Sequence, residues 1–230
     1  MVARVSALVL LASMSQALAA SDPYATSIEL SNGAPGAPTK ITFRFRATSD
    51  VVERVNDIEI GLPDGSSVDS AAFRYTCQLE GTGPESGAVC GEQYEEARVG
   101  YGTMTVELLG MYSLRAAAYR IVPTTGGENL VFFFPGGQIF GVGPQSIFGS
   151  VTLEPSGPAR LRMTNIQQQL DLPFGATAEL EEGVFAFTGE SGSPGFRNPS
   201  GGALGDWRFR TELAWGDGRQ TQRVHAVAPD

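Results

Sequence analysis

The sequence predicts an all-β protein: an antiparallel β-sandwich, jelly-roll or immunoglobulin-like, after an N-terminal signal helix. Three observations support this fold class. Apolar and polar residues alternate with a period of two along most of the chain. The 29 glycines and 14 prolines fall mostly between the alternating runs, where turns are expected. Beyond the first segment, no long window carries an apolar stripe of helical period, and the nearest, around 165–170, is one turn at most.

Residues 1–20 are typical of a cleavable secretory signal peptide. Arg4 is their one charge, an apolar run extends from Val5 to about Met14, and Ala17-Leu18-Ala19 supplies the small residues that a signal peptidase requires. The run is too short to span a bilayer, and no cysteine follows the cleavage point. We therefore expect a soluble product, extracellular or in the cell envelope, without membrane insertion. The alternative is an uncleaved apolar N-terminus.

Residues 21–230 are expected to form one β-sandwich domain, with a split near 125 into two packed β-subdomains as the alternative. The continuously apolar run 130–134 predicts a central strand buried on both faces. Alternation predicts half-buried strands at 41–46, 57–62 and 103–108, and further candidates at 25–31, 115–122, 146–153, 159–163, 183–188, 206–215 and 219–227.

Turn residues separate these strands. Pro63-Asp64-Gly65 predicts a turn, and Trp215-Gly216-Asp217-Gly218 between two alternating segments predicts a hairpin. The glycine-rich stretch 189–205 is the longest expected loop. It is interpreted either as a mobile surface loop or as a boundary before the final hairpin.

The two cysteines, Cys77 and Cys90, are interpreted as a disulfide because the chain is predicted to be exported. Closing a loop of this length contributes on the order of 3 kcal/mol in the chain-entropy model. Two free thiols are the alternative. A structural zinc site would need carboxylates in addition to these cysteines and His225, the one histidine, so no metal or cofactor is expected.

The chain is acidic, with 25 aspartates and glutamates against 16 lysines and arginines. Proteins that bind nucleic acid or anionic membranes use basic patches, so this balance disfavours both kinds of partner. The acidic residues are spread along the chain, which is typical of a surface that keeps a protein soluble.

A serine–histidine–aspartate triad would use Ser191, Asp206 or Asp217, and His225, which occur in a usable order. The run 189–193 fails the G-x-S-x-G pattern at its fifth residue, and no helix is predicted after it. We therefore expect His225 to be a solvated histidine on an edge strand rather than a catalytic base.

Glycoside hydrolysis needs two carboxylates that face each other across a cleft. Glu107 with Glu179 or Glu181 could supply such a pair. Acidic β-proteins commonly offer pairs of this kind, so solvated strand faces are the competing interpretation.

Calcium binding was considered at the acidic run Glu92, Glu95 and Glu96, which follows the second cysteine. The chain contains no D-x-[DN]-x-[DN]-G loop, and Asp217-Gly218 lacks the preceding acids of that pattern. A charged loop without a bound ion is therefore the expected structure of this run.

Carbohydrate binding on a β-sandwich often uses an exposed tryptophan or tyrosine as a stacking platform. Trp207 and Trp215 share the parity of Phe209 and Leu213, whereas the opposite parity holds charged residues: Arg208, Arg210 and Glu212. Both tryptophans are therefore expected in the core.

With these residues in view, the chain resembles a family of uncharacterised exported β-sandwich proteins that are frequent in actinobacteria and other GC-rich bacteria. The resemblance rests on Leu62-Pro63-Asp64-Gly65, the Cys77–Cys90 pair, Val99-Gly100-Tyr101-Gly102, Asn198-Pro199, Trp207 and Asp217-Gly218. The chain departs from the family at Gly91, where proline is common, and at Ser200-Gly201, where the family has another cysteine. The resemblance implies export and a sandwich fold, but no activity.

The leading hypothesis from the sequence is an exported, non-enzymatic β-sandwich that binds a partner, such as a glycan or an envelope protein, or serves as an envelope component. The rival hypothesis is a secreted hydrolase that cleaves polysaccharide with paired carboxylates. A cleft lined by aromatic residues and flanked by two carboxylates would favour the hydrolase.

Overall fold

The computed structural model describes residues 24–48, 55–80, 87–90, 92, 95–107, 110–122, 129–134, 147–154, 160–164, 179–216 and 218–226. These ranges contain β-strands and short 3-10 turns but no α-helix, so the all-β prediction is confirmed. The predicted signal segment 1–20 and the possible helical turn at 165–170 lie outside the described residues. No helix in the described ranges is long and apolar enough to span a membrane.

The largest sheet of the described chain is antiparallel throughout and has eleven strands in the order β1-β3-β13-β8-β9-β10-β11-β12-β4-β15-β16. The strands are β1 (Tyr24–Leu30), β3 (Ile41–Ala47), β13 (Glu179–Phe187), β8 (Arg98–Glu107), β9 (Met111–Arg120), β10 (Leu130–Phe134), β11 (Ile147–Glu154), β12 (Arg160–Thr164), β4 (Val55–Gly61), β15 (Arg208–Trp215) and β16 (Gln220–Ala226). Each of the eleven overlaps a range where alternation or a continuous apolar run predicts a strand, but β8, β9 and β13 begin four or five residues earlier than predicted.

Two smaller antiparallel sheets complete the described fold. The first joins β2 (Pro38–Thr39), β14 (Phe196–Arg197) and β5 (Ser67–Val68), and the second is a hairpin of β6 (Gln78–Glu80) and β7 (Gly87–Val89). The stretch 189–205, expected as a loop, contains β14 and two 3-10 turns, η4 (Glu190–Gly192) and η5 (Leu204–Asp206). This stretch packs closely because Phe196 and Asn198 are buried.

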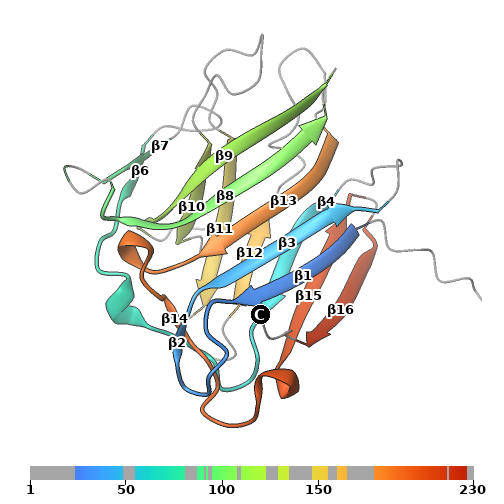
Figure 1. The fold of residues 1–230 in the computed structure, drawn as a ribbon. Helices are drawn as coiled ribbons and strands as arrows, with labels where there is room; N and C mark the ends of the chain where they lie inside the picture. Colours follow the sequence, from blue (N-terminus) through green and yellow to red (C-terminus); the bar gives the residue numbers. More distant parts are fainter. Residues whose placement is uncertain are drawn as a thin grey trace, which may run out of the picture.

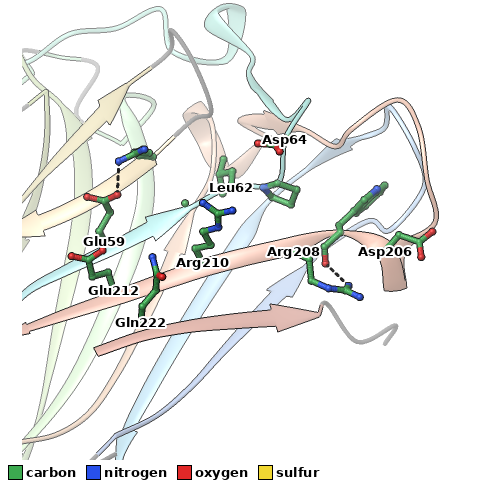
Figure 2. Close-up of a pocket in the computed structure, with 12 residues that line it drawn as sticks. Glu59, Leu62, Asp64, Asp206, Arg208, Arg210, Glu212 and Gln222 are labelled. Carbon is green, nitrogen blue, oxygen red and sulfur yellow. Dashed lines mark hydrogen bonds and ion pairs between the residues drawn. The ribbon is translucent and has the colours of Figure 1, made fainter. Parts of the chain in front are cut away.

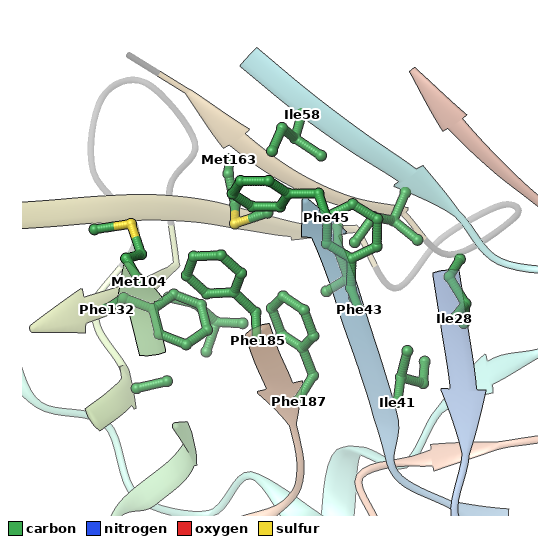
Figure 3. Packing of buried hydrophobic residues seen from close by; sticks show 14 of the residues in the cluster. Ile28, Ile41, Phe43, Phe45, Ile58, Met104, Phe132, Met163, Phe185 and Phe187 are labelled. Carbon is green, nitrogen blue, oxygen red and sulfur yellow. The ribbon is translucent and has the colours of Figure 1, made fainter. Parts of the chain in front are cut away.

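The main sheet curves so that one of its faces encloses the core. In Figure 1, β1, β3, β13, β8 and β9 form a front layer, and β10, β11, β12 and β4 cross behind it. Phe43, Phe45 and Phe185 come from the front layer, and Figure 3 shows Ile58 and Met163 of the rear strands packed over them. Burying each such side chain contributes roughly 1.5–3 kcal/mol, so this layer contact is the main source of stability.

The two edge strands, β1 and β16, approach each other through side chains. Tyr24 of β1 stacks on Trp215 at a centroid distance of 5.7 Å. Thr26 Oγ1 lies 3.0 Å from Nε2 of His225 on β16. These contacts protect edges that would otherwise offer unpaired backbone groups to another chain. Both tryptophans are buried, as their parity predicts, with 4% of Trp207 and 3% of Trp215 exposed.

A disulfide joins Cys77 and Cys90, as predicted. The bond closes the β6–β7 hairpin, because the next residues inward, Gln78 and Val89, are paired in register. Cys77 also bonds to the end of β9, where its N–H donates to the Arg120 carbonyl at 2.8 Å. The disulfide therefore fixes a hairpin that is itself attached to the main sheet.

Candidate functional site

A shallow groove of about 310 Å³ lies on the outer face of β1, β3, β13 and β8. Tyr101 is the one aromatic residue that lines it, and 56% of its surface is exposed. Polar side chains surround the ring, among them Lys40, Thr42 and Ser191. We call this feature the Tyr101 groove.

Small neighbours leave the Tyr101 ring open. In register, Tyr101 is paired with Ala186 of β13 on one side and Ala117 of β9 on the other. Beyond Ala186, the next position on β3 is Thr42. Because these three side chains are short, they form a low floor around Tyr101 and leave its side chain more than half exposed.

A β-bulge in β8 lies immediately before Tyr101. The register between β8 and β9 shifts between Arg98 and Gly100, and the consecutive residues Val99 and Gly100 are both buried. A Cβ on Gly100 would lie 2.3 Å from the Ala186 carbonyl oxygen, so only glycine fits there. After the bulge the strand alternates regularly, and Tyr101 lies on the same outward face as Thr103 and Thr105.

Ser191 contributes a strained residue to the groove. Its φ of 52° makes it the one non-glycine residue with positive φ in the described chain. Left-handed backbone costs a non-glycine residue about 1–2 kcal/mol, so the surrounding contacts must hold it in place. Among the described residues the Ser191 hydroxyl has no hydrogen-bond partner, and it remains open to a ligand.

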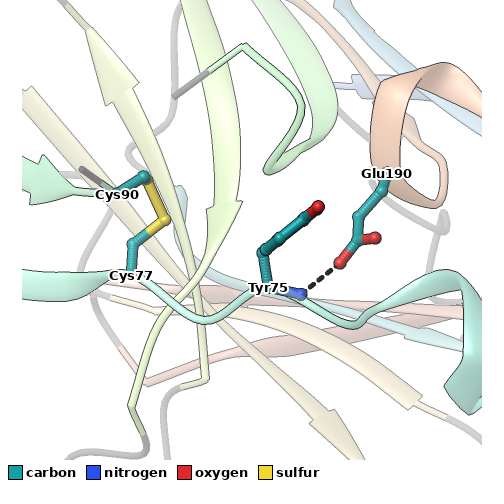
Figure 4. Close-up of a disulfide and its surroundings, with 4 residues drawn as sticks. All are labelled: Tyr75, Cys77, Cys90 and Glu190. Carbon is teal, nitrogen blue, oxygen red and sulfur yellow. Dashed lines mark hydrogen bonds between the residues drawn. A yellow bond between two sulfur atoms is a disulfide. The ribbon is translucent and has the colours of Figure 1, made fainter. Parts of the chain in front are cut away.

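The buried carboxylate of Glu190 holds this turn. The side chain is 5% exposed and accepts hydrogen bonds from the backbone N–H of Tyr75 and, at 3.2 Å, from Nε of Arg74 (Figure 4). The Glu190 carbonyl accepts a bond from the Ser193 hydroxyl at 2.8 Å. Glu190 therefore fixes the backbone that carries Ser191 into the groove.

The groove carries charges of both signs. Lys40 has an ammonium with no side-chain partner in the described chain. Arg98 pairs with Glu95 at 3.3 Å, and Glu29 pairs with Arg44 at 3.2 Å. The groove therefore offers donors and acceptors around an exposed ring.

A second cavity of about 460 Å³ lies on the outer face of β12, β4, β15 and β16, and we call it the β4–β15 pocket (Figure 2). Its walls hold three arginines and four acids. Glu59 pairs with Arg160 at 2.9 Å. Glu59 and Glu212 are directly opposite in register on β4 and β15. Trp207 also lines this pocket but is buried.

Of the residues of the possible triad, Ser191 and Asp206 do not bond to Nε2 of His225, and Asp217 lies outside the described residues. The His225 Nε2 lies 2.8 Å from the Thr211 hydroxyl and 3.0 Å from that of Thr26, so threonines occupy this nitrogen. His225 is on an edge strand, as expected, but it is half-buried. Burial, together with the charge of a neighbouring arginine, lowers the pKa of His225 below its ordinary value.

Of the two groups of acidic residues considered as sites in the sequence, one comes together in the structure and the other does not. Glu107, Glu179 and Glu181 do come together, with carboxylate oxygens within 4.8 Å of one another. This group lines neither of the two cavities described above. In the run after the second cysteine, Glu95 is paired with Arg98, so the structure describes no cluster of these acids.

Comparison with known proteins gives no assignment. No protein-family model matches the chain, and no curated protein shows significant similarity to it.

The sequence analysis missed the residues that build the Tyr101 groove. In the sequence, Val99-Gly100-Tyr101-Gly102 is only one of the short motifs that support the family resemblance. Two glycines next to a tyrosine in an otherwise alternating run are the available signal of a bulge. Nothing in the sequence marks the positive φ of Ser191 or the burial of Glu190.

Proposed function

We propose that this is an exported, non-enzymatic β-sandwich protein that binds a glycan in the Tyr101 groove. The observation that carries the proposal is the exposed ring of Tyr101 on a low floor of small residues. Sugar rings present apolar faces that pack on aromatic rings, with hydroxyls around their edges. The Cys77–Cys90 disulfide supports export, because such bonds persist in oxidising compartments.

The polar rim of the groove suits a glycan. The Lys40 ammonium and the Ser191 hydroxyl can donate to sugar oxygens, and the Glu29 carboxylate can accept from sugar hydroxyls. The turn that carries Ser191 is held by a buried carboxylate, so the hydroxyl is positioned before a ligand arrives. Preorganisation of this kind lowers the entropy cost of binding.

Hydrolysis is supported less well than binding. A glycosidase needs one carboxylic acid that keeps its proton, yet Glu59 in the β4–β15 pocket is ion-paired with Arg160. The aromatic residue of that pocket, Trp207, is buried and offers no stacking face. The acids that gather at Glu107 line neither described cavity.

The test is a glycan array with the mature protein, followed by calorimetry on each glycan that binds. Tyr101→Ala should weaken binding about two- to tenfold, since an aromatic contact is worth roughly 0.5–1.5 kcal/mol. Tyr101→Phe should retain most of the affinity. Met111→Ala on the neighbouring strand removes an equally exposed side chain outside the groove and should change nothing.

Two results would overturn the proposal. The first is equal affinity of wild type and Tyr101→Ala for every glycan bound, which would move the site elsewhere. The second is release of shortened products from a bound glycan, which would identify a hydrolase.

A further inference from the structure

The β4–β15 pocket contains charged groups that the protein itself leaves without partners. Four of the charged groups that line the pocket do have partners within the protein. Arg160 and Glu59 form an ion pair, Arg208 donates to the Trp207 carbonyl, and Asp206 accepts from a backbone N–H. In the described chain, no hydrogen bond or ion pair engages the remaining polar side chains, which are Arg210, Glu212, Asp64 and Gln222. One cation and two carboxylates are therefore open in one cavity.

The floor of the pocket is a glycine between two arginines. Gly61 on β4 is paired in register with Arg160 of β12 on one side and Arg210 of β15 on the other. A Cβ on Gly61 would make ordinary contact with Arg210, 3.6 Å from its Cβ, so a side chain is sterically possible there but would fill the cavity. The missing side chain leaves space beside the open Arg210 guanidinium.

The open charges are separated along the strand. Arg210 and Glu212 are two residues apart on one face of β15, which places their Cα atoms about 7 Å apart. Figure 2 shows Glu59 and Glu212 at one end of the pocket, with Arg210 between them and Asp64. The pocket therefore presents a positive centre at Arg210, with two carboxylates, Glu59 and Glu212, at one end and the single carboxylate of Asp64 on the other side.

We infer that the β4–β15 pocket binds a zwitterionic ligand of dipeptide size. The ligand carboxylate accepts from Arg210, whose planar fork suits bidentate pairing, and the ligand ammonium lies at the Glu212 end. A dipeptide spans at most about 7 Å, and the Cα atoms of Arg210 and Glu212 are separated by about the same length, so a ligand of this size can reach both side chains. A simple anion would satisfy Arg210 alone and would meet the two carboxylates at Glu59 and Glu212, so it fits less well.

This inference is independent of glycan binding, because the Tyr101 groove lies on other strands and shares no lining residue with the pocket. Each site can therefore fail its test without affecting the other.

The two tryptophans of the chain supply a direct readout by nuclear magnetic resonance. Trp207 lines the pocket and its indole N–H donates to the Gly201 carbonyl, whereas Trp215 is not a lining residue and its indole donates to Thr221. Alanyl-alanine at millimolar concentration should shift the Trp207 indole signal and leave the Trp215 signal in place. N-acetyl-alanyl-alanine and alanyl-alanine amide each lack one charge and should bind about tenfold more weakly.

Variants assign the two ends of the ligand. Arg210→Ala should weaken alanyl-alanine about tenfold or more, with partial recovery in Arg210→Lys, which keeps the charge but not the fork. Glu212→Gln should weaken alanyl-alanine but leave the N-acetyl form unchanged. Arg46→Ala, an exposed strand arginine of the front layer, is the matched control and should bind normally.

Three results would refute the inference. The first is an unchanged Trp207 signal at saturating dipeptide. The second is equal affinity for the charged and blocked dipeptides. The third is an equal loss of affinity for alanyl-alanine in Arg46→Ala and Arg210→Ala.

Discussion

Replacing Glu190 by glutamine removes one of the two acceptors that hold the η4 turn. In the native protein, one carboxylate oxygen accepts from the Tyr75 N–H and the other accepts from Arg74 Nε. Glutamine has one acceptor oxygen, so its NH₂ group must face one of these donors. Because Glu190 is 5% exposed, water cannot replace the lost bond.

The two bonds contribute unequally to the cost. Arg74 is 72% exposed, so its ion pair is screened by solvent and contributes at most about 1 kcal/mol. The buried bond from the Tyr75 N–H to a charged oxygen is worth about 1.5–3 kcal/mol. We expect Glu190→Gln to lower the free energy of unfolding by about 2 kcal/mol. For a chain of this length, that lowers Tm by about 4–8 °C.

Thermal unfolding followed by circular dichroism checks this value. Glu29→Gln is the control, since Glu29 also pairs with an arginine, but there the two side chains are 50% and 46% exposed. Its loss should stay below about 0.5 kcal/mol, which is about 1–2 °C. If Glu190→Gln lowers Tm no more than Glu29→Gln does, the buried carboxylate does not hold the turn and the reasoning is wrong.

Three further predictions concern stability. Gly183→Ala should lower the free energy of unfolding by at least about 1–3 kcal/mol in denaturant titration, because its Cβ would lie 2.3 Å from the buried ring of Phe45. Replacing both Cys77 and Cys90 by serine should cost about 3 kcal/mol in the same titration. Burial lowers the pKa of His225, so unfolding free energy should be constant above about pH 6.5 and fall below it, where the unfolded chain binds a proton that the native ring resists.

Each of these predictions has a control. Gly201→Ala adds a methyl group with no heavy atom within 4 Å, and equal losses in it and Gly183→Ala would contradict the packing argument. Wild-type protein unfolded under reducing conditions should match the double serine variant, and a large difference would point to harm from serine itself. His225→Asn should reduce the fall in stability between pH 6.5 and 5.5, and an unchanged slope would assign it to other groups.

Local patterns were sufficient to predict the strands but not their partners. The run from Ile41 to Ala47 alternates cleanly, and its buried and exposed positions follow the predicted parity. Its neighbours in the sheet are β1, close in sequence, and β13, which begins at Glu179. Pairing over such a distance depends on how all the apolar faces close around one core, and alternation within a strand carries no information about that.

A β-bulge sets a second limit on what alternation alone can predict, as a comparison of β15 with β8 shows. The parity of Trp207 and Trp215 was readable because β15 alternates without an extra residue of its own. In β8, the bulge at Val99 inserts one residue, and every side chain before it is on the opposite parity from those after it. A one-residue insertion is invisible to a periodicity count, so the side of the sheet on which Arg98 lies could be known only from the register with β9. Tyr101 follows the bulge and shares the outward parity of Thr103 and Thr105.

The Tyr101 groove differs from the rest of the surface because it contains a residue whose backbone conformation lowers the stability of the fold. Scattered acidic side chains keep a protein soluble and need no further purpose. The left-handed backbone of Ser191 costs about 1–2 kcal/mol in a fold whose total margin is about 5–15 kcal/mol, and the buried Glu190 carboxylate next to it holds the turn against that cost. Glycine at 191 would relieve the strain, yet it would remove the hydroxyl that the turn presents beside Tyr101. The strained serine therefore supports the proposal that a ligand binds in the Tyr101 groove.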